Sequence, residues 1–248
     1  MATGYGKSTI YDNASQITGP TGWYKINTSS GRAYPFYVDQ DYDGGGWVLV
    51  MANRRYTSGM NNLKFNDAMN VPNYRHNGTD DATNDQGIGP TSTLANFNAW
   101  IGLNFWSELA GRATASTITV AQYTAATDGV ALSSTGSHAQ RIRFTGTGFN
   151  STTGAFQGKS GTATLELDTN GWGNSGFYNM LGNPLSTYDQ DNDTNGGNCS
   201  TYYNNQPFFY TSCWTGNIFA GGSSYADGPY WVSSSPTYSQ QYCGVYVK

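Results

Sequence analysis

The chain has 248 residues, enough for one large domain or two small ones, and only 11% of its residues are charged. Its formal net charge is −4, and it has no dense track of Lys and Arg. This excludes nucleic acid as an expected partner, because a phosphate backbone calls for clustered cations. The sequence lacks the run of about eighteen apolar residues that a membrane-spanning helix requires, so no membrane insertion is expected.

The predicted elements follow in chain order. Residues 1–18 are polar and turn-rich, and we expect an attachment segment there, ahead of one domain spanning 19–248. Apolar and aromatic residues in short runs predict strands at 22–26, 35–38, 47–51, 116–120, 140–144 and 163–167. Apolar residues near helical spacing predict a short helix within 94–109. Residues 59–90 are expected to form a loop, and periodicity fades between 171 and 240.

A short acidic segment near the C-terminal end carries the most specific pattern in the chain. Asp191 and Asp193 alternate along it, and Gly196 and Gly197 follow. Two carboxylates on alternate residues can converge, and glycines let backbone carbonyls turn inward, which suits a hard cation that takes six to eight oxygens. A solvated turn without metal is the alternative. An EF-hand is not indicated, because Tyr202 stands where that loop needs Glu.

The three cysteines are Cys199, Cys213 and Cys243. An odd number indicates one disulfide and one free thiol, and a disulfide implies an oxidising environment. The abundance of Gly, Tyr and uncharged polar residues is also typical of extracellular or virion-surface β-rich domains. Aromatic residues crowd the gap between the first two cysteines. They could pack beneath long loops, or they could present ring faces to a carbohydrate.

Three motifs in a fixed order resemble one known family. They are the run Asp-Gln-Asp-Tyr-Asp-Gly-Gly-Gly-Trp at 39–47, the segment 186–213, and Ser-Tyr-Ala-Asp-Gly at 224–228. Over roughly 20–248 the chain is similar to fibrinogen-like domains, which include fibrinogen C-terminal domains, ficolins and tachylectins. The resemblance implies an α+β fold with a small N-terminal subdomain and a central twisted antiparallel sheet with short helices. It further implies a loop-rich C-terminal subdomain that binds calcium and holds the ligand pocket.

The resemblance also implies particular site residues. Calcium (Ca2+) would be bound by the side chains of Asp191 and Asp193 and by the backbone carbonyls of Asn195 and Gly197. The residues around the ligand would be Tyr203, Trp214, Tyr225, Ala226 and Tyr238.

A second set of expectations from the resemblance concerns the cysteines. Cys199 and Cys213 would be bonded, which leaves Cys243 free. The peptide between Ser212 and Cys213 would be cis.

The chain also departs from the family pattern. Val38 stands where one cysteine of an N-terminal disulfide is expected and no cysteine precedes it, Trp214 replaces a histidine, and residues 52–115 are divergent.

The function predicted from these features is calcium-dependent binding of a cell-surface glycan, for instance an acetylated sugar, by a homo-oligomer or another multivalent array. No enzyme is expected, because the chain has only two Glu, no nucleophile elbow and no zinc motif. In a eukaryotic secretory pathway, the sequons at Asn192 and Asn198 would receive glycans that crowd the acidic segment. A chain made outside that pathway is therefore favoured, such as a bacteriophage tail or other virion adhesin. The alternatives are a secreted innate-immunity-type lectin, a polysaccharide-cleaving tail enzyme and a purely structural virion component.

Overall fold

The computed structural model describes most of the chain in nine stretches. They are residues 9–54, 61–74, 99–112, 118–125, 131–135, 139–157, 163–169, 182–213 and 242–248.

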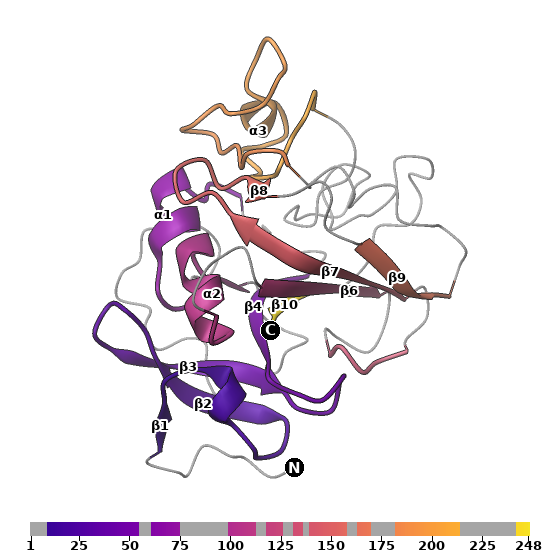
Figure 1. Cartoon of the computed structure of the whole chain (residues 1–248). Coiled ribbons are helices and arrows are strands. Elements are labelled where there is room, and N and C mark those ends of the chain that lie inside the picture. The colour runs from indigo at the N-terminus through magenta and orange to yellow at the C-terminus, as the bar shows by residue number, and fades with distance from the viewer. Residues whose placement is uncertain are drawn as a thin grey trace.

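One mostly antiparallel sheet organises these stretches (Figure 1). Its main path runs β1-β2-β3-β4-β10-β6-β7-β8, while β5 pairs with β4 and β9 pairs with β7. The strand bounds are β1 Ile10–Tyr11, β2 Gly22–Asn27, β3 Ala33–Asp39, β4 Trp47–Arg54, β5 Ala99–Trp100, β6 Ile118–Ala125, β7 Gln140–Phe149, β8 Phe156–Gln157, β9 Ala163–Asp168 and β10 Tyr242–Val247. The helices are short: η2 Ala14–Gln16, α1 Phe65–Asn70, η3 Leu103–Phe105, α2 Trp106–Leu109 and α3 Cys199–Tyr202.

The last strand of the chain completes the middle of the sheet. β10 lies between β4 and β6, so that Gly244 is level with Ala52 on one side and with Tyr123 on the other. Residues 243–247 are all buried. A strand buried on both faces shows no alternation of polar and apolar residues, which explains why the sequence pattern did not predict it. The two ends of the chain are thereby joined in one sheet.

The six strands predicted from sequence are confirmed, with the shifts of a few residues that strand boundaries commonly show. The helix predictions are partly wrong. In the described part of 94–109 the chain forms β5 and then the short helices η3 and α2, and α1 lies inside the stretch expected to be loop. The Lys64 side chain does not cap the start of α1, but the Asp189 carboxylate from a distant segment accepts from the Phe65 N–H at 3.0 Å, and Ala68 and Met69 on the helix are buried. Packing rather than local propensity stabilises so short a helix.

Helices α1, η3 and α2 are packed together by two tryptophans. The Trp100 ring nitrogen donates to the Ala68 carbonyl at 2.9 Å, and the Trp106 ring nitrogen donates to the Ile101 carbonyl at 2.8 Å. The ring centres of Trp100 and Trp106 lie 5.4 Å apart. None of the helices in the described stretches has the length and hydropathy needed to span a bilayer.

Residues 39–47 form the structural turn expected before the Trp47 strand. The Asp39 carboxylate accepts from the N–H groups of Asp41 and Tyr42, each at 3.0 Å. Arg143 on β7 then donates to the Asp43 carboxylate at 2.7 Å and to the Tyr42 hydroxyl at 2.9 Å. The motif therefore fastens the N-terminal strands to the central sheet.

The described part of the N-terminal segment belongs to the domain. Ile10 pairs with Lys25 in a parallel bridge, and Ala14 and Ile17 are buried in the core. Residues 10–17 therefore pack with the domain ahead of the boundary expected at residue 19. An attachment role for the residues before it stays a prediction.

The sheet separates two ends of the molecule (Figure 1). Strands β1 to β3 lie at one end, near the N-terminus, and α3 with its loops lies at the opposite end. The α+β architecture implied by the resemblance is confirmed, with a mostly antiparallel sheet and few, short helices.

Candidate ligand pocket and cation loop

Residues 182–213, here called the C-terminal loops, are attached to the body of the domain by a few backbone contacts. Leu185 is fully buried, and its N–H donates to the Thr153 carbonyl at 3.1 Å. The Asn62 N–H of the body donates to the Asn205 carbonyl at 3.0 Å, and within the C-terminal loops Ser186 and Phe208 form an isolated antiparallel bridge. Three aromatic residues at 208–210 are buried beneath the surface. These contacts give the C-terminal loops a defined backbone although they contain little regular structure.

The Cys199–Cys213 disulfide predicted from the resemblance is present, with the two Cα atoms 5.0 Å apart. Cys243 is free and buried in β10, as expected. Its burial in the apolar sheet raises the pKa of the thiol above its usual value, so the group is held protonated. The disulfide closes the stretch that contains α3.

The expected cis peptide between Ser212 and Cys213 is wrong, because this bond is trans, like every other peptide bond in the described stretches. A cis bond without proline costs about 2.5–4 kcal/mol. The chain reverses here by a different route. Cys213 adopts a φ of 64°, in the left-handed region.

Asp191 and Asp193 converge at the start of the cation loop, which we define as residues 191–197. The Asp193 carboxylate accepts from the N–H of Asn195 at 2.9 Å and from the N–H of Cys199 at 3.0 Å. Partial burial raises the pKa of Asp193, and the neighbouring Asp191 carboxyl raises it further, while the two backbone bonds oppose that shift. A pair of carboxyls this close is an arrangement that a cation would balance.

The residues of the cation loop fit a calcium ion. They offer hard oxygen donors, which calcium prefers. The Asn195 side chain is already engaged, because its oxygen accepts from Gly196 and its nitrogen lies 2.8 Å from the Cys213 sulfur, so its backbone carbonyl remains for a metal. The space around Gly196 and Gly197 is open. Within the described stretches no three acidic, His or Cys side chains gather, so carbonyls and water would complete the shell.

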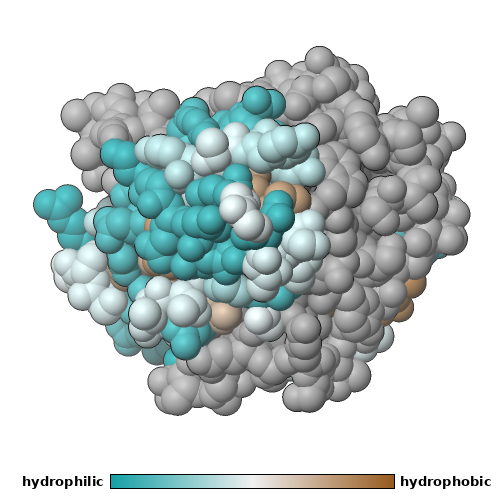
Figure 2. Space-filling view, turned by 90° about the horizontal axis from the view of Figure 1, so that it is seen from above, coloured by the Kyte–Doolittle hydropathy of each residue, from teal (hydrophilic) through white to brown (hydrophobic). Residues whose placement is uncertain are grey.

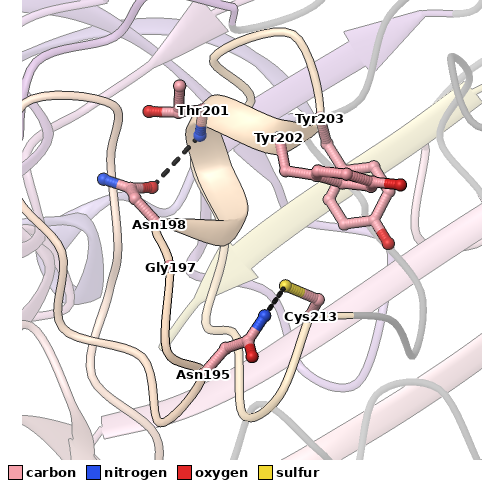
Figure 3. Close-up of a pocket in the computed structure, with 7 residues that line it drawn as sticks. All are labelled: Asn195, Gly197, Asn198, Thr201, Tyr202, Tyr203 and Cys213. Atoms are coloured by element: carbon pink, nitrogen blue, oxygen red, sulfur yellow. Dashed lines mark hydrogen bonds between the residues drawn. The ribbon is translucent and has the colours of Figure 1, made fainter.

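A pocket of about 570 Å³ lies directly beside the cation loop (Figure 3). Its lining in the described stretches is contributed by the cation loop, by α3 with its flanking residues and by the disulfide: Asn195, Gly197, Asn198, Thr201, Tyr202, Tyr203 and Cys213. Tyr203 lines this pocket, and its role in ligand binding stays a prediction. Two of the proposed metal ligands, Asn195 and Gly197, form part of the same wall.

The other four predicted ligand residues lie outside the described stretches. They are Trp214, Tyr225, Ala226 and Tyr238, and the motif at 224–228 lies there too. Their roles stay predictions.

Sequence reasoning missed Asn198, Thr201 and Tyr202. Asn198 caps α3, since its side-chain oxygen accepts from the Thr201 N–H at 3.1 Å, and its side-chain nitrogen donates to the Thr187 carbonyl at 2.9 Å. A polar residue directly before Cys199 was the available signal for this cap. Tyr202 is 78% exposed, and the figure shows its ring beside that of Tyr203 at one side of the pocket (Figure 3).

The surface at this end of the molecule is mainly hydrophilic where it is described (Figure 2). Only small hydrophobic areas interrupt it.

Comparisons with known proteins agree on one fold. The family model described as "Fibrinogen beta and gamma chains, C-terminal globular domain" matches residues 10–241. The fibrinogen-like globe domain of human ANGPTL6 has 18% identity and a TM-score of 0.65, with 100% of this chain and 98% of that chain covered. The same domain of human ANGPTL2 has 16% identity and a TM-score of 0.65, covering 96% and 98%.

A third solved structure is lamprey fibrin D-dimer in complex with the peptide ligand Gly-His-Arg-Pro-amide. It has 14% identity and a TM-score of 0.63, and the match covers 97% of this chain and 74% of that chain. At such identities the likeness to the three structures establishes the fold alone.

Proposed function

This chain belongs to the family of fibrinogen C-terminal globular domains, and on that premise we propose that it is a calcium-dependent protein that binds carbohydrate on cell surfaces. Domains of this family commonly serve in binding or recognition and are typically secreted. One observation carries the proposal. Asn195 and Gly197 belong both to the cation loop and to the wall of the pocket.

Calcium would act on the pocket through that shared wall. Asp191 and Asp193 would bind the ion with their carboxylates, and the carbonyls of Asn195 and Gly197 would complete the protein ligands. The bound ion supplies positive charge that offsets the repulsion between the two carboxylates. The protein then keeps the backbone of 195–197 in one arrangement, because Asn195 is also held against Cys213. Ligand affinity therefore follows calcium occupancy.

A binding role without catalysis is supported by the chemistry of the wall. Its described part carries amide, hydroxyl and phenol groups and a bonded cysteine, and no carboxylate. Glycoside hydrolysis needs two carboxyls that flank the scissile bond. The pocket is open to solvent, so a single site is expected to bind weakly. Useful adhesion then requires several copies in an oligomer or on one particle.

A virion-surface adhesin is the form we favour over a secreted lectin. The Asn192 side-chain nitrogen donates to the Leu185 carbonyl at 2.8 Å, and that of Asn198 donates to the Thr187 carbonyl at 2.9 Å. A glycan attached to either nitrogen at these sequons would replace one of its two hydrogens and would have to fit beside the carbonyl that the nitrogen contacts. This supports a chain that is made outside a eukaryotic secretory pathway.

The experiment compares two matched variants by thermal unfolding and by glycan binding. Asp191→Asn removes the negative charge of one proposed ligand, whereas Asp41→Asn makes the same change at an exposed site in the other alternating acidic segment. Calcium at about 100 times its wild-type Kd should stabilise the wild type and Asp41→Asn by about 2.7 kcal/mol and should stabilise Asp191→Asn clearly less.

Binding to a broad array of immobilised glycans should follow the same pattern. Chelator should abolish it in the wild type and in Asp41→Asn. A wild-type melting temperature that ignores both calcium and chelator would contradict the metal part of the proposal, and absence of binding to every glycan would contradict the rest.

A further inference from the structure

Tyr202 is the most exposed large side chain with apolar character in the described stretches. Its side chain is 78% exposed, compared with 51% for Ile10 and 36% for Leu165. Its backbone, by contrast, is well anchored. Cys199, at the other end of α3, is buried and disulfide-bonded, and Asn198 caps the turn. The ring is therefore presented to solvent from a fixed position.

A row of aromatic rings orients Tyr202. Tyr210 is buried, and Tyr203 stacks on it with ring centres 6.1 Å apart and an interplanar angle of 25°. Tyr202 then meets Tyr203 edge to face, at 5.0 Å and 87°. Because Tyr202 is 78% exposed, its ring remains accessible to a ligand. The face of such a ring attracts the C–H groups of a sugar ring, since an aromatic ring is electron-rich above its plane.

The polar groups around this ring are uncharged. The wall beside it carries the amides of Asn195 and Asn198 and the exposed hydroxyl of Thr201. The described lining includes no Lys, Arg or His that could pair with an anionic ligand. The nearest charged groups in the sequence are the carboxylates of Asp191 and Asp193, which repel anions unless a cation offsets them.

We propose that Tyr202 is the stacking platform of this pocket and that the ligand is a neutral saccharide, such as a hexose or an N-acetylhexosamine, and not a sialic or uronic acid. The inference rests on the proposed carbohydrate-binding function and adds to it a residue that the resemblance did not assign, together with the charge class of the ligand. The ring of Tyr202 supplies the apolar contact, and the neighbouring amides and hydroxyl supply hydrogen bonds to the sugar hydroxyls.

The test measures binding of the full chain, displayed on multivalent particles with calcium present, to immobilised neutral and acidic oligosaccharides. Three variants are compared with the wild type: Tyr202→Ala, Tyr202→Phe and Tyr188→Ala. Tyr188 is a tyrosine of the same C-terminal loops that is not among the described lining residues, so it controls for loss of a ring elsewhere in the segment. The calcium-induced rise in melting temperature is recorded for each and should stay intact.

Tyr202→Ala should weaken binding to neutral glycans about tenfold, equivalent to about 1.4 kcal/mol, while Tyr202→Phe and Tyr188→Ala stay within about twofold of the wild type. Wild-type binding that Tyr202→Ala leaves unchanged would overturn the platform while the carbohydrate function stands. A preference for acidic glycans over their neutral counterparts would overturn the assigned ligand class. If the wild type binds no glycan, the proposed function fails, and this inference fails with it.

Discussion

The central sheet and the C-terminal loops of this domain are stabilised in opposite ways. Residues 47–52 of β4 are all fully buried, and β10 closes the sheet by pairing with strands on both sides. The cation loop, by contrast, is exposed or half-buried throughout. Its order comes from the disulfide and from side chains that bond to the backbone. The comparison teaches that burial of apolar residues stabilises the central sheet, whereas specific hydrogen bonds order the C-terminal loops and leave their binding groups accessible to solvent.

The polar residues of the C-terminal loops therefore carry structure and recognition together. Asp193 satisfies two backbone N–H groups and is also a proposed calcium ligand. Asn198 caps α3, reaches the Thr187 carbonyl and lines the pocket. A loop backbone outside regular structure needs such partners for its N–H and C=O groups. Changes here should affect binding and local order more than global stability.

The largest difference in the free energy of unfolding is expected when one aromatic ring is removed from each region in turn. Trp100 is fully buried and donates a hydrogen bond to Ala68, whereas Tyr202 is 78% exposed. Trp100→Ala should lower the free energy of unfolding by about 3–5 kcal/mol, because it opens a cavity in the core. Tyr202→Ala should change it by about 0.5 kcal/mol or less. Urea denaturation measures both, and equal losses would break the comparison.

Removal of the disulfide should loosen one region without the other. Replacing both Cys199 and Cys213 by Ala opens a bridge with a sequence separation of 14. Loss of loop closure should cost about 3 kcal/mol in the chain-entropy model. Hydrogen exchange should accelerate across residues 186–213, while β4 and β10 keep their protection. Peptide mapping of the unreduced wild type is the control, and a bridge that includes Cys243 would contradict the pairing.

A smaller effect is expected at the cap of α3. Asn198→Ala removes the acceptor of the Thr201 N–H and the donor to the Thr187 carbonyl, so it should destabilise the protein by about 1–2 kcal/mol. Thr201→Ala is the matched control, because it keeps the backbone N–H that the cap uses. Chemical denaturation compares the two. A loss of glycan binding by Asn198→Ala that accompanies its loss of stability would sharpen the comparison, because it would link the cap of α3 to the pocket.

The smallest effect is a dependence on alkaline pH that belongs to the sheet. Burial, followed by the charges of Asp39 and Asp41, raises the pKa of Tyr37 to about 12. The unfolded chain releases this proton near its ordinary value of about 10, so the contribution of Tyr37 is present below pH 10 and is lost as pH rises through 12.

The variant Tyr37→Phe should therefore lose less stability than the wild type between about pH 9 and about pH 11.5. Denaturant midpoints at the two pH values measure this difference. Burial also raises the pKa values of Tyr74 and Tyr246, so some alkaline loss remains in the variant. An identical loss in both proteins would show that Tyr37 does not contribute.

Sequence reasoning succeeded where a short stretch carried its own signal. The run at Trp47 predicted β4, and the resemblance around Cys199 predicted the disulfide to Cys213. It was less successful where distant contacts decide the structure. Helix α1 has no cap from the adjacent Lys64, and its contacts come from the distant residues Asp189, which accepts from the Phe65 N–H, and Trp100, which donates to the Ala68 carbonyl. The bond before Cys213 is trans, and Cys213 has a φ of 64°, which the sequence did not indicate.

By itself, the sequence determined the alternating carboxylates of the cation loop, the positions of six strands and the cysteine pair, because each depends on residues that are close together in the chain or on a motif that resembles a family. Only the tertiary structure decided that β10 lies between β4 and β6, that the cation loop and the pocket share a wall, and that Tyr202 is the exposed end of a row of rings. The physical reason is that contacts between distant segments decide which side chains are buried and which are exposed. A local sequence pattern does not contain that information.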